Sequence, residues 1–176
     1  PTGLDSETAA LFPGAFQDSP MGKIPKGWEL GEVGRIVTLT RDAINPHDTP
    51  EEYFDHYSIP AYDEGREPKR EYGKEIMSNK YAVSPGCILL SKLNPRLSRV
   101  WLPKLSKDVP SVCSTEFLVA LPKKPFCREY IYSLFVSEAF VQDFTALVTG
   151  TSGSHQRVKP EDLLNMTVVC PNQQLM

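Results

Sequence analysis

The sequence predicts an α+β (mixed α/β) fold, as a strand-rich single domain with one main helix near residues 128–148. Short apolar or alternating runs, bounded by proline and glycine, recur along the chain and are typical of β-strands. Only one longer segment repeats its apolar residues at helical spacing, and strands do not alternate with helices as a parallel βαβ sheet requires. The 176 residues, 40 % of them hydrophobic and 23 % charged, suffice for one folded domain with its own core.

The first strands are predicted from apolar alternation and from the residues that interrupt it. Residues 28–39 alternate loosely around two glycines and predict one strand or two, and residues 53–59 predict another strand that ends at Pro60. A continuous apolar run at residues 86–91 follows a Pro-Gly turn and predicts a buried strand. Residues 99–102 predict a short strand after a polar loop.

The second half of the chain supplies the predicted helix. Residues 112–121 alternate between an almost wholly apolar set and a mixed set, and therefore predict one half-buried strand. Residues 128–148 place apolar side chains at helical spacing. Pro160, with two acidic residues behind it, predicts the start of a second helix, and Val168 and Val169 predict a last short strand.

The sequence lacks the usual signatures of enzymes and of membrane proteins. No run of about 18 apolar residues is present, and the first 15 residues lack the basic start and apolar core of a signal peptide, so we expect a cytoplasmic protein. The four cysteines are far apart and the three histidines have no i, i+4 partner, so no metal site is expected. No Walker, Gly-x-Ser-x-Gly or Gly-x-Gly-x-x-Gly motif occurs. We therefore expect no cofactor, no catalytic residue and a non-enzymatic binding module.

The charged residues are unevenly distributed along the chain. A formal net charge of −3 and a pI of about 5.7 argue against a general nucleic-acid binder. Residues 1–22 carry three acids and no Lys or Arg, so the rest of the chain is neutral. Residues 41–64 carry seven acids and one Arg, a net charge of −6, whereas residues 65–107 carry ten basic and three acidic residues, a net charge of +7. This distribution allows a basic face that meets DNA and an acidic face behind it. The alternative is a solvated surface that happens to be rich in Lys.

The loop at residues 91–99 is the first candidate contact with DNA. It lies between two predicted strands, which would hold it rigidly. Its polar residues are Lys92, Asn94, Arg96, Ser98 and Arg99. Lys and Arg hold phosphates or reach guanine, and Asn and Ser can pair with base edges. The alternative is a plain polar turn.

A second candidate loop, at residues 149–157, combines two glycines with several hydroxyl side chains. Thr151 and Ser152 could bond a phosphate, and Gln156 and Arg157 could reach bases. One alternative is a flexible linker. Another is a hydrolase site built on Ser154 and His155, although no acid is placed to orient the histidine.

Four segments stand out by their order and spacing over nearly the whole chain. They are residues 3–13, 24–29, 86–95 and 149–158, the last followed by Leu163 and by a strand end at residues 168–171. Together they resemble a target recognition domain from the specificity (S) subunit of a type I restriction-modification system. Each segment alone is short and unspecific, whereas their combination is much more specific.

The resemblance implies a DNA target recognition domain with a curved mixed sheet at residues 23–171. A lead-in at residues 1–22 would precede it, and residues 172–176 would begin a truncated spacer helix. The implied function is sequence-specific binding of double-stranded DNA, reading one half of a bipartite site. Methyltransferase (modification) and restriction subunits would be the partners that carry out catalysis. The lead-in favours the second recognition domain of a longer subunit, and a half-length subunit is the alternative.

The candidate DNA contacts combine the two loops with part of the basic segment. They are Lys69, Arg70, Lys74, Lys92, Asn94, Arg96, Ser98, Arg99, Thr151, Ser152, His155, Gln156 and Arg157. The competing hypothesis is a protein-interaction or adaptor module that uses the acidic residues 41–64 together with Tyr53, Phe54 and Tyr57.

Overall fold

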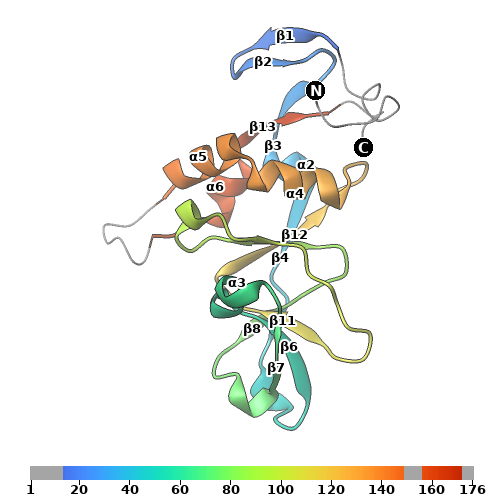
Figure 1. Cartoon of the computed structure of the whole chain (residues 1–176), viewed down its shortest axis with the longest axis vertical. Coiled ribbons are helices and arrows are strands. Elements are labelled where there is room, and N and C mark those ends of the chain that lie inside the picture. Colours follow the sequence, from blue (N-terminus) through green and yellow to red (C-terminus); the bar gives the residue numbers. More distant parts are fainter. Residues whose placement is uncertain (1–13, 149–155, 172–176) are drawn as a thin grey trace.

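The computed structural model describes residues 14–148 and 156–171, and these confirm the α+β fold (Figure 1). A four-stranded antiparallel sheet, in the order β10-β9-β12-β4, lies in the middle of the molecule. Its strands are β4 (Val37–Thr40), β9 (Ile88–Ser91), β10 (Val100–Trp101) and β12 (Phe117–Pro122).

A five-stranded mixed sheet, in the order β5-β8-β11-β6-β7, forms the lower part of the molecule in Figure 1. The pair β11–β6 is parallel and the other pairs are antiparallel, which agrees with the expectation of a mixed sheet. Its strands are β5 (Ala43–Ile44), β6 (Tyr53–Tyr57), β7 (Lys69–Tyr72), β8 (Lys80–Ala82) and β11 (Ser111–Cys113). Three short helices accompany them, namely η1 (Pro46–Asp48), α3 (Ile59–Gly65) and η2 (Gly73–Glu75).

Two further antiparallel pairs complete the described strands. They are β1 (Phe16–Ser19) with β2 (Gly22–Pro25), and β3 (Glu29–Glu32) with β13 (Thr167–Cys170). The single turn α2 (Val33–Ile36) joins β3 to β4, so residues 28–39 form two strands, as one of the two readings predicted. Strand β1 falls inside the predicted lead-in, residues 1–22, where no strand was predicted.

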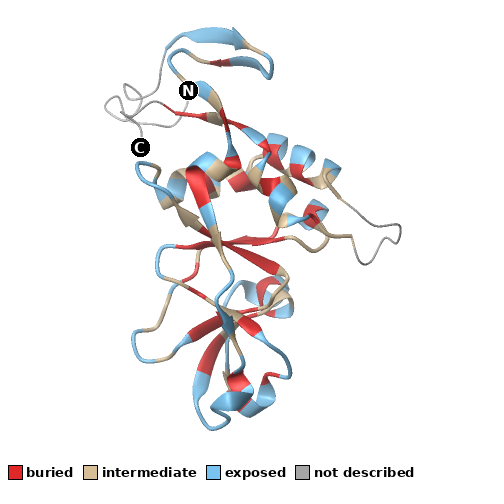
Figure 2. Ribbon diagram, turned by 180° about the vertical axis from the view of Figure 1, so that it is seen from behind, coloured by how far each residue is buried: buried red, intermediate tan, exposed pale blue. Residues whose placement is uncertain are grey.

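The four-stranded sheet is buried on both faces (Figure 2). On one face Ile88 and Leu90 pack with helix residues such as Phe135, and on the other face Leu89 and Val119 pack towards the five-stranded sheet. A strand covered on both faces needs apolar side chains at every position. This explains the continuous apolar run of β9, and the prediction of a buried strand there is confirmed.

The prediction of one half-buried strand at residues 112–121 is wrong. The segment forms β11 and β12, which belong to different sheets. Ser114 separates them, since its carbonyl accepts a hydrogen bond from Phe117 N at 2.9 Å and its N–H donates to the Tyr57 carbonyl at 3.0 Å. Residues 114–116 form a turn between the two strands. In the sequence their side chains fit the alternating pattern, so the turn was not predicted.

The prediction of one helix at residues 128–148 also needs correction, because two helices form, α4 (Arg128–Val136) and α5 (Glu138–Ala146). Ser137 lies between them with extended backbone (φ −66°, ψ 144°), and its hydroxyl oxygen accepts a hydrogen bond from Phe140 N. Serine is a strong N-cap residue, so it begins a second helix here. The rings of Phe135 and Phe140 stack across the break at 4.8 Å.

The remaining predictions agree closely with the structure. Strand β6 ends at Tyr57, Ser58 caps α3, and Pro60 lies in the first turn of α3, a helix that the sequence did not predict. Residues 99–102 contain β10, Pro160 begins α6 (Pro160–Leu164), and Val168 and Val169 lie in β13.

Candidate nucleic-acid interface

The loop between β9 and β10, residues 91–99, is a closed turn that we call the β9–β10 loop. Ser91 N donates to the Arg99 carbonyl at 2.9 Å and joins the two ends of the loop. The Ser91 hydroxyl donates to the Leu93 carbonyl at 3.0 Å. In the middle lies a single 3-10 turn, η3 (Pro95–Leu97), which packs against α5.

Residues 156–158 run alongside this loop. Asn94 N donates to the Gln156 carbonyl at 2.9 Å, and Val158 N donates to the Lys92 carbonyl at 3.1 Å. Leu93 and Arg157 form an antiparallel bridge between these bonds. The structure thus joins the β9–β10 loop to the described end of the second candidate loop.

The other candidates in that second loop, Thr151, Ser152 and His155, lie outside the described residues, as does Ser154. Of the second loop, the structure therefore places only Gln156 and Arg157, and both are half-buried.

Two residues with left-handed backbone enclose η3. Asn94 has φ 48° and ψ 62°, and Ser98 has φ 42° and ψ 57°. Among the described residues, Arg66 is the other non-glycine residue with positive φ. Such a conformation costs about 1–3 kcal/mol per residue and persists where the surroundings enforce it. The buried Pro95 and the hydrogen bonds to residues 91 and 156 supply that enforcement.

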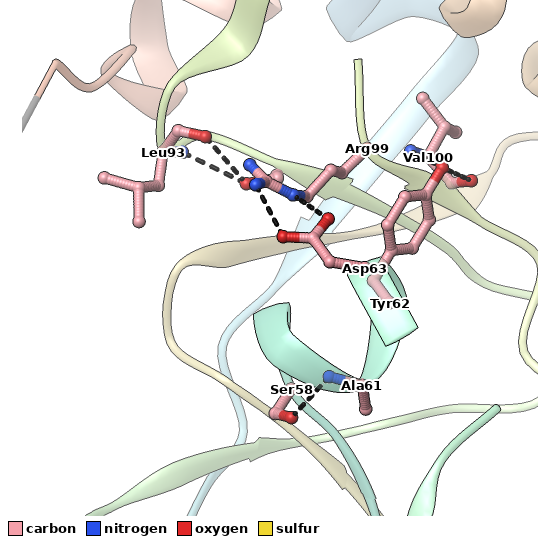
Figure 3. Close-up of polar contacts among 8 residues, drawn as sticks. Ser58, Ala61, Tyr62, Asp63, Leu93, Arg99 and Val100 are labelled. Carbon is pink, nitrogen blue, oxygen red and sulfur yellow. Dashed lines mark hydrogen bonds and ion pairs between the residues drawn. The ribbon is translucent and has the colours of Figure 1, made fainter. Parts of the chain in front are cut away.

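Arg99 fixes the end of the loop to helix α3. Figure 3 shows its guanidinium facing the Asp63 carboxylate, with Nε donating to Oδ1 at 2.7 Å and Nη2 donating to Oδ2 at 2.8 Å. The Arg99 hydrogen bond lowers the pKa of Asp63. Arg99 is only 9 % exposed, so its guanidinium is engaged in this ion pair rather than presented to a ligand.

The neighbouring Tyr62 strengthens the same junction. Its hydroxyl lies 3.3 Å from both the N–H and the carbonyl of Val100, the residue after Arg99, as Figure 3 also shows. Its ring packs edge-on against Trp101, with the centroids 5.4 Å apart. Helix α3 therefore holds both the end of the β9–β10 loop and the start of β10.

Arg157 is paired in a similar way on the other side of the loop. Its Nη2 donates to Glu116 Oε1 at 2.8 Å, and its Nε lies 3.0 Å from Glu116 Oε2. The Glu116 carbonyl accepts a hydrogen bond from Lys92 N at 2.9 Å. Glu116 thus contacts both the β9–β10 loop, through Lys92, and residues 156–158, through Arg157. The Arg157 side chain therefore stabilises the contact between these two segments.

The candidates that remain for contact with a ligand are fewer than the sequence predicts. Arg96 is exposed on η3, and the described part of the chain offers its guanidinium no partner. Lys92 is half-buried and lines a cavity of about 290 Å³ together with Arg41 and Tyr81. Ser98 is half-buried, and the side-chain oxygen of Asn94 is buried without a partner among the described residues.

Lys69, Arg70 and Lys74 lie elsewhere, on β7 and η2 at the edge of the five-stranded sheet (Figure 1). Each of them pairs with an acid. The pairs are Lys69–Glu64 at 2.8 Å, Arg70–Asp55 at 2.9 Å and Lys74–Glu51 at 3.0 Å. The structure does not bring these three residues to the β9–β10 loop.

This pairing corrects the expected division into a basic face and an acidic face. With Arg99–Asp63, four basic residues of the segment 65–107 pair with four acids of the segment 41–64. The antiparallel pairing of β6 with β7 places Asp55 opposite Arg70, and α3 carries Asp63 and Glu64, the partners of Arg99 and Lys69. Four of the ten basic residues and four of the seven acidic residues of the two segments are thus paired with each other.

Sequence reasoning missed the residues that support the loop. Asp63 and Glu116 are far from the loop in sequence, and only the fold brings their carboxylates to Arg99 and Arg157. Leu97 lies in the same loop, and its exposure of 51 % is visible only in the structure.

Two classes of site find no support in the described residues. No group of three or more His, Cys, Asp or Glu side chains within residues 14–148 and 156–171 is arranged to hold a metal ion. Among the same residues, no helix is long and apolar enough to cross a membrane.

No protein-family model matches this sequence, and no curated protein matches it. Three solved structures are similar in fold. A chain from a structure on complex assembly and conformational transition of the type I R-M system has a TM-score of 0.69 and 24 % identity, over 87 % of this chain and 40 % of that chain. The HsdS subunit from Thermoanaerobacter tengcongensis has a TM-score of 0.68 and 22 % identity, over 88 % and 40 %. The type I restriction-modification S subunit from M. genitalium has a TM-score of 0.52 and 13 % identity, over 81 % and 34 %.

These likenesses confirm, at the level of fold, the resemblance that the sequence motifs indicated. The present chain spans about 40 % of the length of the first two structures.

Proposed function

We propose that this chain is a DNA target recognition domain of a type I restriction-modification specificity subunit. In this role it binds double-stranded DNA in a sequence-specific manner, reads one half of a bipartite site and performs no catalysis. The β9–β10 loop is its reading element.

The observation that carries the proposal is the construction of that loop. It is closed on itself, joined to residues 156–158 and fixed by two Arg–carboxylate pairs, yet it leaves Arg96 exposed on the turn η3. An exposed arginine on a rigid support can donate two hydrogen bonds to guanine O6 and N7 in the major groove. Rigid presentation favours specificity because little side-chain and loop freedom is lost on binding.

The other loop residues divide into contacts and supports. Lys92 would hold a phosphate beside the loop and supply the salt-dependent part of the affinity. Ser98 and Gln156 are half-buried beside Arg96 and remain candidates for polar contacts with DNA. Arg99 and Arg157 act through their carboxylates as positioning residues. Lys69, Arg70 and Lys74 are weaker candidates for DNA contact, because each is paired with an acid at the edge of the five-stranded sheet.

The partners follow from the same proposal. Methyltransferase subunits and a restriction subunit would perform methylation and cleavage, and this domain would direct them to the site in the cytoplasm. The protein-interaction alternative has less support, because the acids Glu51, Asp55, Asp63 and Glu64 are paired within the chain. Phe54 and Tyr57 are buried, so of its three aromatic candidates only Tyr53 is exposed.

Selection from a random pool of duplex DNA tests the proposal. The chain is used within its specificity subunit, assembled with the methyltransferase subunits, since one domain alone offers few contacts. We expect an enriched bipartite motif, and binding that weakens steeply as the salt concentration rises. A complex that enriches no sequence, at a salt concentration where it retains DNA, would contradict the proposal.

A further inference from the structure

We propose that Leu97 is a specificity-determining residue that reads a thymine 5-methyl group within the half-site that the β9–β10 loop contacts. The inference rests on the proposed function and names one chemical group that the site recognises. Leu97 is not among the polar residues that the sequence selected.

The first observation is an exposed apolar side chain at the tip of the loop. Leu97 ends η3 and is 51 % exposed. The other large exposed apolar residues among those described lie elsewhere, on β1, near β2, in β6, after η2 and at the end of α4. They are Phe16, Met21, Tyr53, Met77 and Val136. Leu97 is therefore the large exposed apolar residue of the β9–β10 loop.

The second observation is that the backbone is fixed on both sides of this residue. Asn94 and Ser98 hold left-handed conformations before and after η3, and Ser98 N donates to the Pro95 carbonyl at 2.9 Å. The next residue is Arg99, which the Asp63 pair holds. Strained backbone that the surroundings enforce is concentrated at functional sites. Here the surroundings enforce a strained turn that exposes both Arg96 and Leu97.

The third step is chemical. The thymine methyl is the apolar group of the major groove, and it distinguishes T·A from the other base pairs through contact with apolar side chains. A leucine that remains exposed in the free protein loses contact with water when it packs against this methyl. Removing one such contact costs about fourfold in affinity, on the scale of a buried methylene. Arg96 and Leu97 are both exposed residues of the one turn η3, so a duplex that meets this turn is within reach of both.

The experiment uses two random duplex pools, one synthesised with thymidine and one with deoxyuridine, which lacks only the 5-methyl group. The specificity subunit, assembled with its methyltransferase subunits, is selected on both pools as wild type, Leu97→Ala and Leu97→Met. Met77→Ala is the matched control, because Met77 is 81 % exposed but lies after η2, outside the β9–β10 loop.

We expect the wild type to prefer thymine at one position of the motif, and to lose about fourfold of that preference on the deoxyuridine pool. Leu97→Ala should show the weaker preference on both pools, whereas Leu97→Met and Met77→Ala should behave as the wild type. A wild-type motif that is the same on both pools, or unchanged by Leu97→Ala, would overturn the inference and leave the proposed function standing. A wild type that enriches no motif at all would overturn both.

Discussion

Three arginines of the candidate interface are chemically alike, and their surroundings give them different roles. Arg99 and Arg157 each donate hydrogen bonds from two guanidinium nitrogens to one carboxylate, that of Asp63 and that of Glu116 respectively. Arg96 is exposed, and the residues that the structure describes offer it no carboxylate. From residue type alone, all three arginines are candidates for contacts with bases. The acidic partners of Arg99 and Arg157 leave Arg96 as the arginine available to DNA.

The first prediction at this scale concerns Arg96. Arg96→Ala should cost about 1–3 kcal/mol of binding free energy on the cognate site and relax specificity at one base pair, because a bidentate contact with guanine is lost. Competition binding against duplexes substituted at each position measures this. Lys107→Ala, an exposed basic residue outside the loop, is the control. An Arg96→Ala complex that loses affinity equally for all duplexes would mean that Arg96 contacts phosphate.

The second residue-scale prediction concerns stability and pH. Burial lowers the pKa of His56 below its usual value, and the hydrogen bond from Nδ1 to Glu71 at 2.7 Å opposes this shift without overcoming it. The unfolded chain therefore takes up a proton first as the pH falls, so the free energy of unfolding should fall from about pH 7 downwards until the folded histidine also titrates. His56→Asn should flatten this slope, as measured by urea unfolding between about pH 7.5 and 5.

The control for that measurement is His47→Asn, at an exposed position of η1. A wild-type free energy of unfolding that rises as the pH falls through this range would contradict the prediction. It would mean that the pairing of protonated His56 with Glu71 outweighs burial.

At the scale of elements, α3 and β12 hold the β9–β10 loop from two sides. Asp63 of α3 pairs with Arg99, and Glu116, just before β12, pairs with Arg157. The position of the loop therefore depends on contacts with elements that are distant from it in sequence.

The prediction for α3 is that Arg99→Lys weakens sequence discrimination while the domain remains folded. Lysine keeps the charge but loses the bidentate geometry. The stability cost should be about 1–2 kcal/mol, below that of a fully buried pair because Asp63 is half-exposed. Circular dichroism and competition binding measure the two effects.

Arg70→Lys is the matched control for this variant, because Arg70 makes the same two-bonded contact with Asp55 at the edge of the other sheet. It should lose comparable stability and keep its sequence discrimination. Equal loss of discrimination in the two variants would show that the effect comes from general destabilisation and not from the loop.

A second prediction at the element scale concerns the break between α4 and α5. Ser137→Ala should lower the free energy of unfolding by about 1 kcal/mol, because the cap of α5 is lost. The melting temperature should fall by about 2–4 °C. Ser133→Ala, at an exposed position inside α4, should cause no loss, since alanine favours helix. A more stable Ser137→Ala variant would indicate that the chain prefers one continuous helix.

At the scale of the whole molecule, the four-stranded sheet lies between the α4–α5 layer and the five-stranded sheet, so it is covered on both faces (Figure 2). Strand β9 was predictable because double burial leaves a continuous apolar run. The division of residues 112–121 between two sheets was not predictable. The apolar alternation continues through the turn between β11 and β12, so the sequence pattern is the same as that of one strand.

The candidate site was predictable in part for a related reason. The polar composition of residues 91–99 identified the loop, and local sequence cannot show which of its charges are paired. The partners Asp63 and Glu116 reach Arg99 and Arg157 only through the tertiary fold. The separation of net charge along the chain was misleading for the same reason, because the pairing of β6 with β7 places opposite charges side by side.

The central claim is that the β9–β10 loop reads the DNA sequence, and methylome sequencing tests it most directly. Cells that carry the complete system are compared with cells in which residues 92–98 have been exchanged for the corresponding loop of another specificity subunit. An exchange of residues 74–79, at the edge of the other sheet, is the control. The account predicts that one half of the methylated bipartite motif changes with the loop exchange and stays the same in the control. Active methylation of an unchanged motif after the loop exchange would contradict it.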